Sequence, residues 1–231
     1  MTKSKEDNKK RTNIVMSIIL AVFLVIIILF SSLNAMIFNK DFYYSEYSKN
    51  DVYSKIPQSS AKNMTANVMD YFHGSSELKY FTDTEKNHMQ DVKNLVMIMN
   101  YLYYLSVILL AAMFIYLYRK IKDDKVRFIK ILTNALLYSS IFCLVLLLIV
   151  FLMCVFYFDL TFTLFHLIFF PQGNWMFASS SLLITLFPEQ FFFDISLRIF
   201  IYAIFQTAIF LGIGLWIRKH LKTYEEYQAK R

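Results

Sequence analysis

Long apolar runs alternate with polar segments along the chain. The four apolar runs cover residues 14–38, 95–118, 131–158 and 195–217. A helix needs about 20 apolar residues to cross a hydrocarbon core that is roughly 30 Å thick, so each run is long enough for one span. Hydrophobic residues make up 57% of the chain, with only four Gly and three Pro, which is unusual for a water-soluble domain. The pattern predicts an all-α integral membrane protein with four transmembrane helices.

The first apolar run, residues 14–38, follows five basic residues and has the polarity of a secretory signal. However, the hydrophobic core of a signal peptide spans only about 7 to 15 residues, and this run is much longer. We therefore interpret it as an uncleaved membrane anchor.

Charged and reactive side chains are rare inside the four runs. Arg198 is the only charged residue there, and it follows Asp194 by four residues, so we expect the two to pair on one helix face. The only cysteines, Cys143 and Cys154, lie in the third run and form no CxxC pattern. We expect them to be small core residues, with no disulfide framework and no metal site.

The polar segments differ in charge. Residues 1–13, 119–130 and 218–231 together contain sixteen Lys and Arg and six Asp and Glu, whereas residues 39–94 and 159–194 contain seven Lys and eleven acids. Because cytoplasmic loops are enriched in Lys and Arg, the first group is predicted to be cytoplasmic and the second extracytoplasmic. The net charge of +7 then reflects membrane orientation, so no nucleic-acid partner is expected.

The stretch 131–170 carries Asp159 as its single charge and could in principle hold two spans instead of one. Two spans would move the basic C-terminal segment outside, and the stretch has no Gly or Pro for the turn. We therefore predict one span over 131–158, followed by a short apolar segment, 160–170. Eleven residues cannot cross the bilayer, so this part of loop 159–194 is predicted to be re-entrant or interfacial.

The first outer loop, residues 39–94, is predicted to be largely helical near its end. A polar, tyrosine-rich stretch over 41–60 precedes an amphipathic helix over 59–72, which the sequence His73-Gly74-Ser75 interrupts. Thr82 and Glu85 have the spacing of a capping box, after which a helix is expected to continue into the second span.

Two histidines are predicted to lie at the same depth near the outer membrane surface. His88 is on the helix before the second span, with Glu85 and Asp91 three residues to either side, where they could orient its ring and favour its charged form. His166 lies in the apolar part of the second outer loop, and an ionisable group in such a segment is by default a functional candidate. Solvated and structural roles for each histidine remain the alternatives.

Two sequence blocks carry a family resemblance. Residues 85–93 read EKNHMQDVK, while residues 165–192 contain FHLIFF, NWMF and LITLFPEQFF in that order. Together with the span order and loop sizes, these blocks resemble the bacterial lipoprotein intramolecular transacylases, four-span membrane proteins of Gram-positive bacteria. One departure is the sequence Ala-Ser-Ser-Ser at 178–181, where the family usually has Asp-Pro and a further Asp.

The resemblance implies transfer of an acyl chain from the glyceryl ester of a diacylglyceryl-cysteine to its own α-amino group, which gives an N-acyl, lyso-form lipoprotein. It also implies that His88 and His166 are the catalytic pair. Our own hypothesis is that the more buried His166 has the lower pKa and suits the base, whereas His88, beside Glu85 and Asp91, suits the acid. Substrate-binding or supporting roles are expected for Glu85, Asp91, Asn174, Trp175 and Glu189. The expected partners are diacylglyceryl lipoproteins and membrane lipid at the outer leaflet of the plasma membrane, with no cofactor and no metal.

Two other classes of function compete with this interpretation. A metal-dependent membrane hydrolase could use His88, His166, Asp91 and Glu189 as zinc ligands, although their spacing forms no local metal motif. A noncatalytic assembly or transport subunit would tolerate substitution of either histidine. The sequence contains no GxSxG elbow, P-loop or HExxH helix, and it leaves the oligomeric state open.

Overall fold

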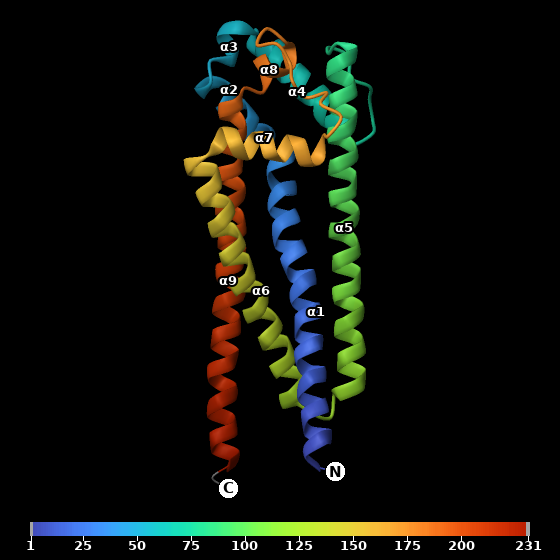
Figure 1. The fold of residues 1–231 in the computed structure, drawn as a ribbon, viewed down its shortest axis with the longest axis vertical. Helices are drawn as coiled ribbons and strands as arrows, with labels where there is room; N and C mark the ends of the chain where they lie inside the picture. Colours follow the sequence, from blue (N-terminus) through green and yellow to red (C-terminus); the bar gives the residue numbers. More distant parts are fainter. Residues whose placement is uncertain (1, 230–231) are drawn as a thin grey trace. The chain divides into compact units, whose positions relative to one another are not determined.

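The computed structural model describes residues 2–229, and this part of the chain is helical and contains no strand (Figure 1). The helices are α1 (Thr2–Ile37), α2 (Lys40–Lys49), α3 (Val52–Lys55), α4 (Gln58–Phe72), α5 (Asp83–Ile121), α6 (Lys125–Phe156), α7 (Phe158–Phe169), α8 (Leu182–Leu186) and α9 (Glu189–Ala229).

The four long helices α1, α5, α6 and α9 correspond to the predicted spans, although α1 ends one residue before the predicted end at 38 and α6 two residues before the predicted end at 158. Each is long and apolar enough to cross a membrane, which confirms the all-α, four-span prediction. The helices also extend beyond the apolar runs. α5 has 39 residues, and at a rise of 1.5 Å per residue it is about 58 Å long, nearly twice the hydrocarbon thickness. Its first turns, which carry His88, therefore project beyond the apolar run that starts at residue 95.

The end of the third span is a sharp break at Tyr157, which has φ −142° and ψ 50°. α6 ends at Phe156, and α7 starts immediately afterwards as a separate helix. α7 has 12 residues, so its length of about 18 Å is too short to cross the bilayer. The stretch 131–170 therefore forms one long helix and one short one, as predicted, and not two spans.

Backbone contacts divide the described residues into two compact units. The first contains residues 2–31, 102–148 and 202–229, and the second contains residues 32–101 and 149–201. All of the candidate site residues belong to the second unit.

The interhelical contacts of the first unit include an apolar cluster around Leu20, Leu117 and Ile131 and several contacts through small and polar residues. Ser17 of α1 donates to the carbonyl of Ile131 of α6 at 3.1 Å. A Cβ atom added at Gly214 of α9 would meet Leu137 Cδ2 of α6 at 2.9 Å, so a larger residue would require the Leu137 side chain to shift. Such contacts are typical of helices packed in hydrocarbon, where burying apolar surface against another helix gains little.

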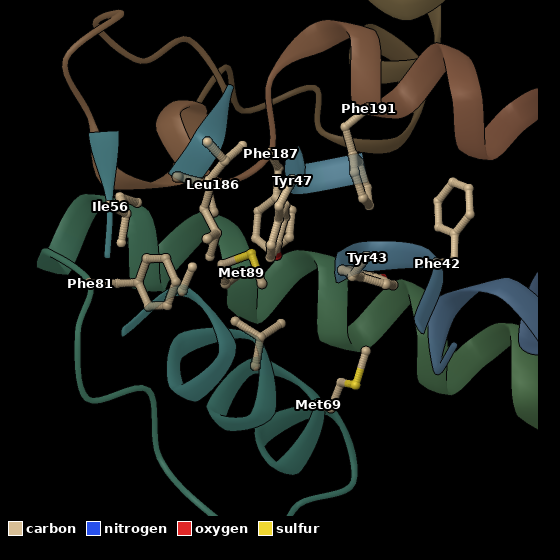
Figure 2. Packing of buried hydrophobic residues seen from close by; sticks show 14 of the residues in the cluster. Phe42, Tyr43, Tyr47, Ile56, Met69, Phe81, Met89, Leu186, Phe187 and Phe191 are labelled. Atoms are coloured by element: carbon tan, nitrogen blue, oxygen red, sulfur yellow. The ribbon is translucent and has the colours of Figure 1, made fainter. Parts of the chain in front are cut away.

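The second unit has an aromatic core (Figure 2). Tyr47 of α2 is completely buried, and its hydroxyl is 2.7 Å from the hydroxyl of Thr65 on α4. The side chain of Met89, next to His88 on α5, lies in the same core beside Tyr47. The residues of α2, α3, α4 and α8 thus pack against the face of α5 that carries Met89, the residue that follows His88.

The tyrosine-rich stretch over 41–60 is more ordered than its polar composition suggested. It forms α2 and α3 because Phe42, Tyr43 and Tyr47 are buried on one side of α2. The amphipathic helix predicted over 59–72 is α4, and Gly74 follows it with a φ of +78°.

The charge at the start of α9 is paired differently from the prediction. The Asp194 carboxylate lies 2.6 Å from the Lys49 ammonium of α2, and not against Arg198 as predicted. This ion pair joins two elements that are far apart in the chain.

Candidate active site

The capping box at the start of α5 positions His88. The Glu85 carboxylate accepts hydrogen bonds from the Thr82 backbone N–H at 2.9 Å and hydroxyl at 2.8 Å. Its other oxygen accepts the Leu183 N–H of α8 at 2.8 Å. Glu85 therefore stabilises the first turns of two helices, which fixes the turn of α5 from which His88 projects.

The same hydrogen bonds determine the charge of Glu85. Burial alone would raise its pKa, but the N–H groups of Leu183 and Thr82 and the Thr82 hydroxyl together lower it. Glu85 is thus a buried, ionised capping residue whose described hydrogen bonds go to Thr82 and Leu183 and not to His88.

His166 is held on α7 by its own helix. Its Nδ1 atom is 2.8 Å from the carbonyl oxygen of Phe162, four residues earlier. A carbonyl only accepts, so in the neutral ring Nδ1 carries the hydrogen, and Nε2 keeps its lone pair for a proton. The ring is only 7% exposed. The structure thus fixes both the orientation and the tautomer of this imidazole.

The two imidazoles face each other. Their ring centroids are 6.1 Å apart, and the ring planes differ by 25°. Aromatic rings contact one or both of them: Phe162, Phe165, Phe170, Trp175 and Phe177. Residues from separate predicted loops thus share one aromatic enclosure.

Both imidazoles have lowered pKa values. Burial lowers the pKa of His88 most, and the neighbouring His166 lowers it further, while Asn174 and Asp91 oppose the shift. Burial also lowers the pKa of His166, against the carbonyl of Phe162. The prediction that acidic neighbours make His88 favour its charged form is therefore wrong, because burial and the second histidine outweigh them.

Asp91 anchors the loop that follows α7. Its Oδ2 atom accepts hydrogen bonds from Gln172 Nε2 and from Asn174 Nδ2, each at 2.6 Å. Between these two residues Gly173 adopts a φ of +78°, which favours glycine. Asp91 thus links α5 to the loop and was not found to orient the His88 ring directly.

Asn174 and Trp175 bring polar atoms to the imidazoles. The indole of Trp175 lies 4.7 Å from the His166 ring, centroid to centroid. The Asn174 amide is close enough to raise the pKa of His88. Within residues 2–229, however, Asn174 Oδ1, His88 Nδ1 and Trp175 Nε1 are buried and take part in no complete hydrogen bond.

Glu189 is the predicted residue that the structure keeps apart from the pair. It begins α9, and its side chain is exposed. Burial and the negative charge of Asp159 raise its pKa. Its described interactions therefore join it to Asp159 and to neither imidazole.

The ligand set of the zinc alternative is not assembled in the described structure. Within residues 2–229, no three His, Cys, Asp or Glu side chains come together closely enough to hold a metal ion.

Several contributors to the enclosure were not predicted as site residues. Phe162 and Phe170 lie one helical turn before and after His166, and this spacing could have revealed them. The roles of Gln172 and Phe177 depend on the loop conformation, for which the sequence offers no periodic signal. Ser181, within the segment that departs from the family pattern, caps α8 through a 3.2 Å bond from the Ile184 N–H.

Comparison with known proteins gives a consistent result. A family model described as "Lipoprotein intramolecular transacylase Lit" matches residues 18–192. An uncharacterized protein of Aquifex aeolicus (strain VF5) is 32% identical over 143 residues, which cover 62% of this chain and 60% of that protein. The aligned region thus spans about three fifths of the length of this relative.

The fold is similar to that of a solved structure, the membrane integral lipoprotein intramolecular transacylase Lit from Bacillus cereus. The two share 19% identity with a TM-score of 0.80 over 93% of this chain and 99% of that one. A form of the same protein with a histidine-to-arginine substitution gives a TM-score of 0.77 at 17% identity, over 97% and 100% of the two chains.

The family match covers the segment that contains both histidines, and it confirms the resemblance indicated by the sequence. With its four apolar helices, the chain is a multi-pass membrane protein. It belongs to the lipoprotein intramolecular transacylase family.

Proposed function

We propose that this protein is an acyltransferase that acts within a single diacylglyceryl lipoprotein. It moves one acyl chain from the glyceryl ester to the α-amino group of the same cysteine and leaves an N-acyl lyso form. Family membership supports the enzyme class. The observation that carries the mechanism is the facing pair of buried imidazoles, His88 and His166, with their ring centroids 6.1 Å apart.

The proposed reaction needs two proton transfers. The neutral amine attacks the ester carbonyl, so that an N–C bond forms and the carbonyl oxygen becomes an oxyanion. The nitrogen then loses a proton, and the C–O bond to glycerol breaks as the departing oxygen gains a proton. Each transfer by a positioned side chain is worth about 10²- to 10⁴-fold in rate.

We assign the base role to His166 and the acid role to His88. His166 donates its Nδ1 hydrogen to Phe162, which leaves Nε2 as the acceptor for the amine proton. Burial and His166 lower the pKa of His88 overall, but Asp91 places a carboxylate near this ring and favours its protonated form. We therefore propose His88 as the group that protonates the leaving oxygen. A positive charge on one ring disfavours a second charge on the other, and the active pair therefore carries one positive charge in total.

The aromatic enclosure supports transfer in preference to hydrolysis. Rings such as Phe170 and Phe177 pack against His88, and apolar walls of this kind would limit the access of water to a bound ester. Because amine and ester belong to the same molecule, holding them together replaces a bimolecular encounter and supplies much of the acceleration.

We further propose that both termini are cytoplasmic and that the imidazoles lie at the outer leaflet. The distribution of basic residues supports this orientation. α7 leaves Leu164, Leu167 and Ile168 exposed, as suits a helix in contact with lipid. Diacylglyceryl lipoproteins and membrane lipid are the proposed partners.

The test is mass spectrometry of a reporter lipoprotein from cells with and without this protein. Acyl transfer within one molecule is an isomerisation, so the intact mass stays constant. Fragmentation and an amine-reactive label must therefore detect the loss of the free α-amine and the new N-acyl group. A free amine that persists in cells containing the protein would refute the proposal, and loss of one acyl chain without N-acylation would indicate hydrolysis.

Histidine variants test the mechanism. His88→Ala and His166→Ala are each expected to lower the rate by at least about 10²-fold, because each removes one proton-transfer group. His220→Ala is the matched control, since His220 is exposed near the end of α9 in the other unit. Full activity in either active-site variant, at equal membrane abundance, would remove that histidine from the mechanism.

A further inference from the structure

Three buried polar atoms around the imidazoles have no hydrogen-bond partner in the structure. They are His88 Nδ1, Asn174 Oδ1 and Trp175 Nε1. Buried polar groups in folded proteins are nearly always paired, so each exception requires an explanation. The Asn174 amide also interacts with His88, whose pKa it raises. An amide oxygen has two lone pairs, so Asn174 Oδ1 can serve this ring and a ligand together. Three such atoms within one aromatic enclosure indicate groups that can bind a ligand.

The orientation of the Asn174 amide is fixed by Asp91. The Asp91 carboxylate only accepts hydrogen bonds, so it must face the amide nitrogen of Asn174, at 2.6 Å. The amide oxygen then necessarily points away from Asp91, and it is the buried, unpaired atom. Asp91 also holds Gln172 at 2.6 Å, which fixes the backbone on the other side of Gly173. Asn174 thus presents an acceptor that cannot be exchanged for a donor.

Trp175 presents the opposite chemistry. An indole nitrogen can only donate, and in this residue it is buried and unpaired. The ring lies against His166, with centroids 4.7 Å apart and planes inclined by 33°. The enclosure therefore contains one fixed acceptor and one fixed donor beside the two imidazoles.

We propose that these two groups bind the reacting atoms of the substrate, an inference that rests on the proposed function. Trp175 Nε1–H donates to the carbonyl oxygen of the ester, and this bond strengthens as the oxygen becomes an oxyanion. Asn174 Oδ1 accepts one N–H of the attacking α-amine, while the other N–H faces His166. Asp91 is a positioning residue that acts through Asn174.

This assignment supplies what the imidazoles alone lack. The proposed pair moves protons, but a tetrahedral intermediate also needs a donor for its negative oxygen. An ester carbonyl has no hydrogen to give and requires a donor, which matches the indole. A neutral amine uses its lone pair for attack and offers its hydrogens to acceptors, which matches the amide oxygen. Loss of one oxyanion donor typically lowers kcat about 10²- to 10³-fold.

The first test removes the indole N–H and keeps an aromatic side chain at position 175. Trp175→Phe, and the replacement of Trp175 by benzothienylalanine through codon suppression, are compared with wild type on a synthetic diacylglyceryl-cysteinyl peptide. Both variants are expected to lower kcat about 10²-fold with little change in KM. Trp216→Phe is the control, because Trp216 is an exposed residue in the other unit. A benzothienylalanine enzyme within threefold of wild type would overturn the indole assignment.

The second test combines an enzyme change with a substrate change. Asn174→Leu removes the acceptor, and an α-N-methyl substrate removes the hydrogen that this acceptor would bind. Asn174→Leu is expected to slow the unmethylated substrate at least tenfold and the N-methyl substrate less than threefold. The N-methyl substrate has already lost its N–H contact with Asn174 Oδ1 in the wild-type enzyme. Equal slowing of the two substrates would overturn the amine assignment.

The third test separates positioning from a general loss of structure. Asp91→Ala should lower kcat to the level of Asn174→Leu, whereas Asp91→Asn should restore most of it, since its amide oxygen can accept both bonds. Failure of Asp91→Asn to rescue would contradict the positioning role. If wild type itself formed no N-acyl product, the proposed function would fail. Normal wild-type activity with unaffected variants would reject only this further inference.

Discussion

The two compact units differ in the side chains that hold their helices together. In the first unit, helices approach closely through small and polar side chains such as Ser17 and Gly214. In the second unit, buried aromatic side chains such as Tyr47 and Phe191 form a core of the kind found in water-soluble proteins. Hydrocarbon offers no hydrophobic driving force between helices, whereas an aqueous surround does.

This difference explains where the candidate site is built. Its geometry depends on the Glu85 carboxylate, which accepts hydrogen bonds at the starts of α5 and α8, and on Asp91, which accepts a hydrogen bond from Asn174 in the loop after α7. Each of these carboxylates joins elements that are far apart in the chain. We conclude that the second unit is specialised for placing side chains accurately. Matched substitutions in the two units can break or sharpen this comparison.

The largest expected effect is that of Glu85→Ala. It leaves the N–H groups of Thr82 and Leu183 without their charged acceptor and is expected to cost about 3 to 5 kcal/mol of stability, together with most of the activity. Thermal unfolding in detergent measures the change. In the first unit Glu225 pairs with Lys130 where both are half-exposed, so Glu225→Ala should cost at most about 1 kcal/mol. Equal costs for the two variants would show that the units do not differ in this respect.

The next effect concerns the close helix contact of the first unit. A Cβ at Gly214 would meet Leu137 Cδ2 at 2.9 Å, whereas a Cβ at Gly212 would meet nothing within 4 Å. Gly214→Ala should therefore be about 1 to 3 kcal/mol less stable than Gly212→Ala in detergent unfolding. Acyl transfer below the unfolding temperature should be unchanged in both. A fall in activity for the folded Gly214 variant would show that packing in the first unit also sets the site.

A smaller effect is expected in the core of the second unit. Tyr47→Phe loses the hydrogen bond to Thr65, although the Thr65 hydroxyl still donates to the Ala61 carbonyl at 2.8 Å. The cost should be about 1 kcal/mol, because only one partner becomes unpaired. Tyr104→Phe, at an exposed position of the first unit, should change stability by less than about 0.5 kcal/mol. A cost for Tyr47→Phe no larger than this control would mean that the hydroxyl pair adds nothing to the core.

The predictable part of the fold was the part with local signals. The four spans follow from apolar length alone, and the capping box of Thr82 and Glu85 follows from its spacing. The helix α2 was missed because its apolar face exists only through burial of tyrosines against other elements. A polar composition hides this kind of core, since tyrosine carries a hydroxyl but buries a large ring.

The sequence predicted which residues belong to the candidate site better than it predicted the contacts between them. Topology and family resemblance brought His88 and His166 together before any coordinates, and their rings do face each other. The link from Asp91 to Asn174 spans 83 residues, and no sequence spacing encodes such a contact. The predicted charge preference of His88 was wrong because burial and His166 outweigh the carboxylate of Asp91 on the same helix.

The smallest expected effect is a change of pH profile. The carboxylate of Asp91 is one of the influences that raise the pKa of His88, against burial and His166. In Asp91→Asn this influence is lost, so the pKa of His88 falls and the ring loses its proton at lower pH. Since His88 is the proposed acid, the alkaline limb of kcat should move to lower pH. At the optimum kcat should fall less than about tenfold, because neutral hydrogen bonds still hold the loop.

Comparison of two enzymes on one substrate isolates this effect, because the titration of the substrate amine is common to both. Asp83→Asn is the matched control on the same helix, since the Asp83 side chain is 99% exposed. Its alkaline limb should coincide with that of wild type. If the Asp91→Asn limb instead moved to higher pH or stayed in place, His88 would not be the acid whose proton reaches the glyceryl oxygen. The role would then pass to His166, whose pKa is lowered by burial, against the raising effect of the Phe162 carbonyl, with no carboxylate among its causes.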